Sequence, residues 1–187
     1  ILDCGANLGL GVLYFKKLYP KAKITAFDPD KEVLAYLTRN LVGAGINDVE
    51  VVPKGVWSTA RTLRFLSEGS DSGRIVLKGG EANREISTVR LRDYLTEPID
   101  FLKIDVEGAE MEILRDCADR LSCVKYLFVE HHSFINETQT FPEMVSLLQT
   151  AGFRCHFQTV RASQQPFTEI NTSLGMDQQM NVFAFRP

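Results

Sequence analysis

The stretch DCGANLG, residues 3–9, follows a short apolar segment and leads into a run with helical apolar spacing. A glycine directly after a strand lets the backbone turn without a Cβ clash and lets a ligand approach closely. Two more glycines at the start of the expected helix, Gly9 and Gly11, leave N–H groups that can meet that ligand. Residues 3–9 therefore predict a strand–turn–helix unit with a small-molecule site at the turn.

The rest of the chain repeats this alternation of strands and helices. Apolar spacing predicts helices at residues 7–19, 33–41, 106–121 and 140–152, and strands at residues 1–3, 23–27, 49–52, 99–104, 124–129, 153–160 and 180–185. The alternation predicts an α/β fold in which a mostly parallel sheet carries helices on both faces. The last helix is expected to begin with a capping box at residues 140–143.

Residues 56–98 depart from the alternating pattern, with short β-like stretches between Gly/Ser-rich turns. They predict an antiparallel β-rich insertion rather than a βαβ crossover. The length of 187 residues, 44% of them hydrophobic, suits a single domain over residues 1–187. Because residue 1 already lies in a predicted strand, we expect that further N-terminal residues precede this sequence.

Acidic residues stand at the ends of four predicted strands, namely Asp3, Asp28, Asp105 and Glu130. Ligands of parallel sheets bind beyond the carboxyl ends of the strands. We therefore expect these four carboxylates to share one rim of the sheet, close to the bound ligand.

The glycine spacing distinguishes between two classes of cofactor. A dinucleotide site needs G-x-G-x-x-G against the pyrophosphate, whereas residues 5–11 have the pattern G-x-x-x-G-x-G with Asp3 before it. An acid at that place suits S-adenosylmethionine (SAM), which carries an ammonium and a sulfonium, and repels the phosphates of NAD. The predicted SAM contacts are Asp3, Gly5, Asn7 and Gly9 at the methionine end, Asp28 at the ribose, Val56 and Trp57 at the adenine, and Asp105 beside the methyl group.

Several of these residues have a purely structural alternative. Asp3 and Asp28 could cap helices or form turns. Trp57 could be ordinary core packing. The four cysteines form no close Cys-x-x-Cys pair and are expected to be buried and reduced.

Acids and histidines at the ends of two predicted strands supply the candidate catalytic groups. An alcohol is a poor nucleophile until it loses its proton, and a positioned base contributes about 10²–10⁴-fold. The candidate bases are Asp105, Glu130, His131 and His132. If the strand continues through both histidines, their side chains point in opposite directions, so at most one faces the cleft.

Two more acids, Glu107 and Glu110, are expected to share one face at the start of the next helix, near the acceptor. The alternative is that they complement the helix dipole. Asp105, Glu130 and a histidine would suit Mg, Mn or Zn as ligands. No HExxH motif or Cys/His cluster is present, so no metal site is predicted.

Four segments together resemble the FkbM family of SAM-dependent methyltransferases: DCGANLG at residues 3–9, AFDP at residues 26–29, FLKIDVEGAE at residues 101–110, and a strand ending in VEH at residues 129–131. The resemblance covers nearly the whole chain and implies a seven-stranded Rossmann-like sheet whose last strand is antiparallel. It also implies methyl transfer to a hydroxyl oxygen of a sugar or natural product. The family often has Glu at the position of Asp28, which is shorter but can still reach a ribose.

Net charge and hydropathy limit the kinds of molecule that the protein is expected to bind. The net charge of −3 and the absence of a Lys/Arg-rich run argue against nucleic acid and favour a small hydroxylated acceptor. No apolar run reaches the ~18 residues needed to span a bilayer, and we expect a cytoplasmic location. The alternatives are a methyltransferase with a protein or nucleic-acid acceptor and an NAD-dependent oxidoreductase. The sequence predicts no oligomeric state.

Overall fold

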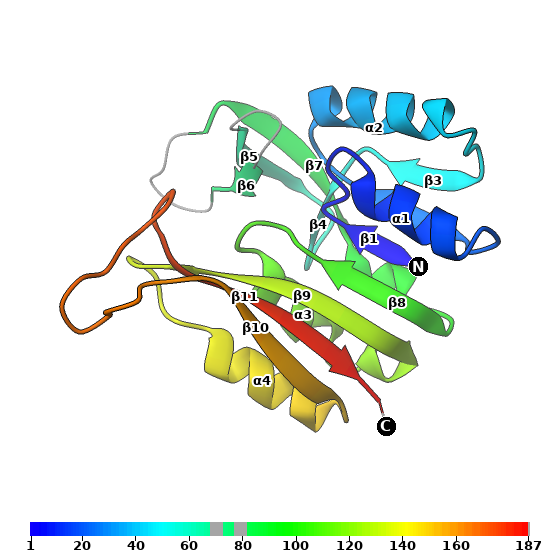
Figure 1. Cartoon of the computed structure of the whole chain (residues 1–187). Coiled ribbons are helices and arrows are strands. Elements are labelled where there is room, and N and C mark those ends of the chain that lie inside the picture. The colour runs from blue at the N-terminus through cyan, green and yellow to red at the C-terminus, as the bar shows by residue number, and fades with distance from the viewer. Residues whose placement is uncertain (68–72, 77–81, 187) are drawn as a thin grey trace.

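The computed structural model describes residues 1–67, 73–76 and 82–186, which form one large sheet, a smaller sheet and the helices around them (Figure 1). The large sheet has the strand order β10-β11-β9-β8-β1-β2-β3. Its strands are β1 (Leu2–Cys4), β2 (Ile24–Phe27), β3 (Val49–Val52), β8 (Ile99–Ile104), β9 (Val124–Phe134), β10 (Arg154–Ala162) and β11 (Met176–Phe185). The helices are α1 (Leu10–Leu18), α2 (Lys31–Gly43), α3 (Glu110–Cys117) and α4 (Phe141–Thr150), with 3₁₀ turns at Leu91–Tyr94 and Leu121–Cys123.

The pairing directions confirm the predicted sheet. β3, β2, β1, β8 and β9 pair in parallel, and β11 lies antiparallel between β9 and β10. The last strand is therefore the antiparallel one. This places the carboxyl ends of β1, β2 and β8 at one edge of the sheet, as expected for an α/β fold that binds a ligand there.

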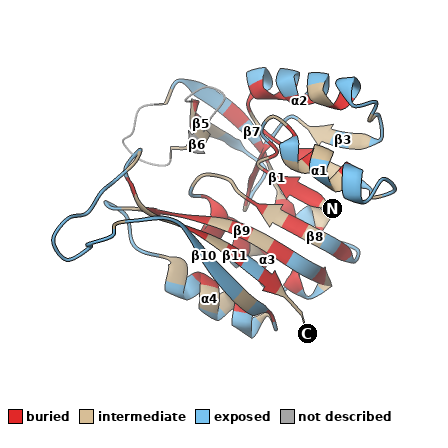
Figure 2. Cartoon of the chain, in the orientation of Figure 1, coloured by how far each residue is buried: buried red, intermediate tan, exposed pale blue. Residues whose placement is uncertain are grey.

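The two faces of the large sheet are covered by different helices (Figure 1). α1 and α2 pack on one face through Val12, Leu34 and Leu37. α3 and α4 pack on the other face, where Leu114 and Met144 join the larger core cluster. Figure 2 shows that β10, at the edge of the sheet, is largely exposed. Apolar stripes at helical spacing account for both packed faces.

The insertion forms a second sheet with the order β4-β7-β5-β6, built from β4 (Gly55–Trp57), β5 (Thr62–Ser67), β6 (Gly73–Ile75) and β7 (Arg84–Arg90). β5 pairs antiparallel with both β6 and β7. The prediction of a wholly antiparallel insertion is wrong for β4, which pairs in parallel with β7. The chain reverses between β4 and β5 and again between β5 and β7, so β4 and β7 run the same way. The turns predicted at residues 69–72 and 78–80, and the predicted strand residue 77, lie outside the described residues.

Several element boundaries differ from the prediction. α3 begins at Glu110 rather than at residue 106, because Glu107 (φ 55°) and Gly108 (φ 101°) have left-handed backbone that a helix cannot include. β9 continues to Phe134 instead of ending at residue 129, because β11 pairs with it as far as Met176. Hydrogen bonding to a neighbouring strand thus extends an element through residues whose polarity had indicated its end.

The expected capping box at residues 140–143 is wrong. Thr140 makes no side-chain cap to α4, and its hydroxyl lies 3.0 Å from Nε2 of His131 instead. The Glu143 carboxylate accepts from the Arg115 guanidinium of α3. At α2 the capping side chain is Asp30, which accepts from the backbone N–H of Glu32.

All four cysteines are free thiols. The prediction of buried reduced cysteines holds for Cys4 and Cys117, whereas Cys123 and Cys155 are half-buried. Among residues 1–67, 73–76 and 82–186, no helix has both the length and the apolar character needed to cross a membrane.

Arg186 joins the segment before β9, the first residue of β9 and the residue after α4. Its guanidinium lies 4.2 Å from the centre of the Phe153 ring and donates to the backbone carbonyls of Leu121, Val124 and Ala151. Since hydrogen bonds from a charged group contribute about 1.5–3 kcal/mol, we expect Arg186→Met to lower the free energy of unfolding by about that amount or more. Urea unfolding measures it. The exposed Arg154→Met is the control, and an equal loss in both variants would contradict the role of Arg186.

Candidate active site

A pocket lies at the carboxyl edge of the large sheet, between that sheet and the insertion. Its lining comes from the turn after β1, the ends of β2 and β8, the start of α2 and the small sheet. The lining residues are Gly5, Asn7, Phe27, Asp28, Pro29, Asp30, Val33, Gly55, Val56, Phe65, Gly73, Ile75, Ile86, Asp105, Val106 and Glu107. Of the predicted cofactor contacts, Gly5, Asn7, Asp28, Val56 and Asp105 are among them.

The turn after β1 packs tightly against the end of β8. Gly5 has φ 82°, and its N–H and that of Ala6 both donate to the Phe27 carbonyl at 3.0 Å. A Cβ on Gly5 would lie 1.7 Å from the backbone oxygen of Asp105. Gly9 (φ 81°) is the N-cap of α1, and its Cβ position faces Leu37 rather than the pocket. Glycine is therefore required at both places. At Gly5 the reason is the tight turn beside the pocket, and at Gly9 it is the packing of α1 against α2.

Asp28 projects from the end of β2 into the pocket. Its Oδ2 accepts from the backbone N–H of Asn7 at 3.0 Å, and its Oδ1 accepts from the N–H of Asp30 at 2.9 Å. Burial raises the pKa of Asp28, while these two backbone hydrogen bonds act in the opposite direction. Each oxygen has a further lone pair, so the carboxylate is held in place and can accept two more hydrogen bonds.

Apolar side chains form the other part of the pocket, between α2 and the small sheet. They are Val33, Val56, Phe65, Ile75 and Ile86. Trp57, the next residue after Val56, is 3% exposed and belongs to the main core cluster rather than to the pocket lining. Trp57 thus lies where the alternative interpretation, ordinary core packing, had placed it.

Asp3 lies beneath the turn rather than in the pocket, and it is 1% exposed. Its Oδ1 is 3.4 Å from Nζ of Lys103, which also contacts Asp105 Oδ2 at 3.0 Å and donates to the Gly5 carbonyl at 2.9 Å. Burial raises the pKa of Asp3, and the charge of Lys103 opposes this. Burial alone would lower the pKa of Lys103, but the Asp3 and Asp105 carboxylates outweigh it and leave that pKa raised. One ammonium group therefore holds the turn and two acids together.

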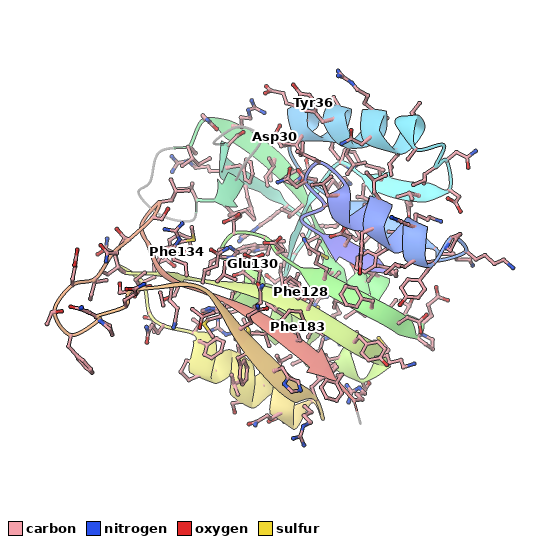
Figure 3. All side chains as sticks on the ribbon, viewed as in Figure 1. Asp30, Tyr36, Phe128, Glu130, Phe134 and Phe183 are labelled. Carbon is pink, nitrogen blue, oxygen red and sulfur yellow. The ribbon has the colours of Figure 1, made fainter. Side chains whose placement is uncertain are left out.

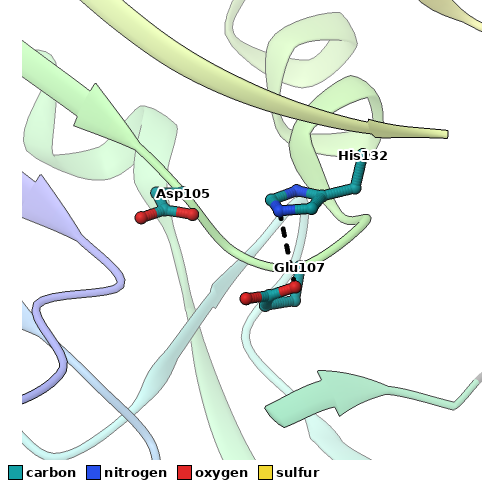
Figure 4. A group of neighbouring side chains, drawn as sticks. All are labelled: Asp105, Glu107 and His132. Carbon is teal, nitrogen blue, oxygen red and sulfur yellow. Dashed lines mark ion pairs between the residues drawn. The ribbon is translucent and has the colours of Figure 1, made fainter. Parts of the chain in front are cut away.

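His132 faces acidic side chains near the end of β8, and Figure 4 shows two of them, Asp105 and Glu107. Its Nδ1 lies 2.9 Å from Oε1 of Glu110 and its Nε2 lies 3.4 Å from Oε2 of Glu107. Ligand atoms of Asp105, Glu107 and His132 all lie within 4.8 Å of one another. Burial would lower the pKa of His132, but Glu110, Glu107 and Asp105 outweigh it and raise that pKa to about 9.

A tight turn, and not the expected helix face, brings Glu107 and Glu110 together. Glu107 precedes α3, so the prediction that both residues open one helix is wrong. The N–H of Gly108 donates to Oε1 of Glu110 at 2.9 Å, and a Cβ on Gly108 would lie 2.9 Å from the Phe134 ring. The left-handed turn at residues 107–108 directs the Glu107 carboxylate back toward His132.

Glu130 lies two residues before His132 on β9, on the same face of the strand. Figure 3 shows it between Phe128 and Phe134 along β9. The side-chain amide of Gln179, on β11, donates to its Oε1 and lies 3.4 Å from Nε2 of His132. Burial, and then the charge of Asp105, raises the pKa of Glu130.

The two histidines of β9 point to opposite faces of the sheet, as predicted for a strand that continues through them. His131 is 1% exposed, packs edge-to-face on Phe141 and contacts Thr140. The structure thus brings His132, and not His131, to the acidic cluster.

Two residues of this site carried no prediction. Lys103 stands two residues before Asp105 and is therefore on the same face of β8, a spacing that could have indicated the ion pair. Gln179 lies in a segment expected to be a loop, and no local pattern indicates its contact with Glu130 and His132. That contact arises only from the pairing of β11 with β9.

The chain is similar in sequence and in fold to known methyltransferases. Residues 3–155 match the family described as Methyltransferase FkbM domain. Methyltransferase sdnD of Sordaria araneosa is 30% identical over 191 residues, which cover 82% of this chain and 73% of that protein. The 2-O-methyltransferase NoeI of Sinorhizobium fredii is 25% identical, over 70% of this chain and 62% of that protein.

The crystal structure of a methyltransferase FkbM from Methylobacillus flagellatus superposes on 97% of this chain with a TM-score of 0.61, at 16% identity. This chain spans 42% of the length of that one. The structural likeness shows a shared fold, and the sequence match over residues 3–155 shows the family. This chain belongs to the FkbM family of methyltransferases.

Proposed function

We propose that the protein transfers a methyl group from SAM to a hydroxyl oxygen of a sugar or other small natural product. The observation that carries the proposal is the pocket at the carboxyl edge of the sheet, where the Asp28 carboxylate faces an apolar slot and Asp105 and Glu107 line another part. A ligand with an apolar base, a diol and a positive charge matches these three features.

The chain's own residues fit the parts of SAM. Asp28, fixed by two backbone N–H groups, has free lone pairs for the two ribose hydroxyls. Val56, Phe65 and Ile86 provide flat apolar contact for the adenine. The turn at Gly5 and Asn7 meets the methionine part, and Asp3 acts there through Lys103.

Bound SAM supplies an electrophilic methyl group on a positively charged sulfur. The displacement is in line, so holding the acceptor oxygen in place provides much of the catalysis. We assign proton acceptance from the acceptor hydroxyl to the carboxylates of Asp105 and Glu130, with Glu107, Glu110 and His132 shaping the acceptor side of the cleft. His131 faces α4 and takes no part. The relative NoeI, a 2-O-methyltransferase, supports oxygen as the acceptor atom.

Asp28 provides the test of the cofactor assignment. In Asp28→Asn the amide nitrogen would face a backbone N–H donor, and one carboxylate hydrogen bond to the ribose would be lost. Because a hydrogen bond to a charged group contributes about 1.5–3 kcal/mol, we expect SAM affinity to fall by about 10–150-fold in calorimetric titration. Asp48→Asn, at an exposed carboxylate that pairs with the buried Lys16 and lies outside the pocket lining, should bind SAM like the wild type. Wild-type protein that binds NAD and ignores SAM would overturn the proposal.

The acceptor class is tested separately by transfer of a ¹³C-labelled methyl group. The protein and labelled SAM are incubated with matched panels of hydroxylated, amino and carboxylated small molecules, and the products are read by NMR. An O-methyl carbon signal on sugars or polyols is expected. Transfer confined to nitrogen or carboxylate would contradict the hydroxyl assignment while leaving SAM as the cofactor.

A further inference from the structure

Asp105, Glu107 and His132 form a cluster with the composition and spacing of a metal site. Their ligand atoms lie within 4.8 Å of one another, and Glu107 Oε2 is 3.4 Å from His132 Nε2. Two atoms bound to one ion at about 2.0–2.2 Å are separated by about 3.0–3.5 Å when they are neighbours in the coordination shell. The Glu107–His132 pair already has that separation.

Glu110 gives His132 the orientation that a ligating histidine needs. Its carboxylate is 2% exposed and lies 2.9 Å from Nδ1 of His132, so Nδ1 keeps its proton toward Glu110, and Nε2, which would exchange its proton for an ion, faces Asp105 and Glu107. Metal-bound histidines nearly always donate their second ring N–H to such a carboxylate, which fixes the tautomer and the ring. The N–H of Gly108 donates to the same carboxylate and holds it in turn.

The charge around the cluster favours a cation. Asp105, Glu107 and Glu110 meet there, and Gln179 links His132 to a fourth acid, Glu130. The described cationic side chains that contact the three clustered acids are Lys103 and His132. Lys103 is also engaged by Asp3 and by the Gly5 carbonyl. An ion at Asp105, Glu107 and His132 would balance acids that the chain leaves in excess.

We propose that Asp105, Glu107 and His132 bind one divalent transition-metal ion, with Glu110 as the positioning residue of His132. Two carboxylate oxygens and one imidazole nitrogen suit Mn²⁺ or Zn²⁺ better than Ca²⁺, whose ligands are oxygens. The sequence had indicated Glu130 as the second acid of such a set, whereas the structure places Glu107 there. Three protein ligands leave coordination positions open, and these would hold the acceptor hydroxyl. Only that last role rests on the proposed methyl transfer.

The test is binding of Mn²⁺ to the chelator-treated protein, followed by electron paramagnetic resonance in the absence of SAM. We expect one bound ion per chain with a ¹⁴N hyperfine coupling from the His132 imidazole, and competition by Zn²⁺. The coupling should disappear in His132→Gln. Glu110→Gln should weaken Mn²⁺ binding by about 10–100-fold, as expected for the partner of a ligating histidine.

Glu107→Gln keeps the shape of a half-buried side chain and removes its charge, so it tests the site even if His132→Gln folds poorly. Matched controls are His156→Gln and Glu137→Gln, both exposed and outside the cluster, which should bind Mn²⁺ like the wild type. Mn²⁺ binding that is equal in Glu107→Gln, or that lacks nitrogen coupling in the wild type, would overturn the inference. SAM titration of the same samples separates the two proposals: Mn²⁺ binding without SAM binding supports the metal site and contradicts the proposed function, and SAM binding without Mn²⁺ binding does the reverse.

Discussion

Lys103→Met is expected to lower the free energy of unfolding by about 3–5 kcal/mol, the usual effect of removing one partner of a buried ion pair. The Lys103 side chain is 19% exposed, and the Asp3 side chain beside it is 1% exposed. Methionine fills a similar volume but leaves the Asp3 carboxylate without its cation and the Gly5 carbonyl without its donor. Urea unfolding followed by circular dichroism measures the loss.

Two further variants distinguish charge burial from loss of packing. Lys125→Met removes a cation that lies over the Tyr126 ring on the exposed part of β9, and should change stability by no more than about 0.5 kcal/mol. The double variant Asp3→Asn/Lys103→Met removes the stranded charge as well and should recover part of the lost stability. If the double variant were less stable than Lys103→Met, the ion pair would not be the reason for the effect.

Gly5→Ala should be at least as damaging, with an expected loss of at least about 4 kcal/mol, in the range that single substitutions reach only through a specific steric or electrostatic conflict. The added Cβ would overlap the Asp105 backbone oxygen at 1.7 Å, and neither partner is a flexible side chain. The residue would also have to keep φ 82°. Relief requires the end of β8 to separate from the turn, so SAM binding should be lost together with stability.

Two other glycines provide the comparison. Gly45 has φ 70° but open space around its Cβ position. Gly45→Ala should therefore lower the free energy of unfolding only by the strain of left-handed backbone, about 1–2 kcal/mol. Gly43, in the last turn of α2, has neither constraint, and Gly43→Ala should be neutral or stabilising. Thermal unfolding of the three variants should follow that order. Similar losses in Gly5→Ala and Gly45→Ala would show that the contact with Asp105 is unimportant.

The sequence by itself determined the architecture of the large sheet. Alternating strand and helix patterns predicted a mostly parallel sheet, and the observed order with an antiparallel β11 confirms it. The turn at residues 3–9 and the acids Asp28 and Asp105 were predicted at the carboxyl edge, where Gly5, Asn7, Asp28 and Asp105 line one pocket. These features depend on local periodicity and on glycines at turns, and both are properties of consecutive residues.

Only the tertiary structure decided which side chains meet. Asp3 was expected at the ligand, but the Asp3–Lys103 register of β1 and β8 places it against an ammonium group beneath the turn. Alternation along β9 allowed at most one histidine to face the cleft, but the sequence could not say which one. The pairing of β9 with β8 and β11 directs His132 to the acids and His131 to α4.

Tertiary structure also decided the positions of Glu107 and Gln179. A left-handed turn at residues 107–108, held by the Gly108–Glu110 hydrogen bond, replaces the helical start that apolar spacing had predicted. Gln179 reaches Glu130 from a strand about fifty residues further along the chain. Contacts between residues far apart in the sequence depend on strand register and on packing, and no pattern of neighbouring residues contains that information.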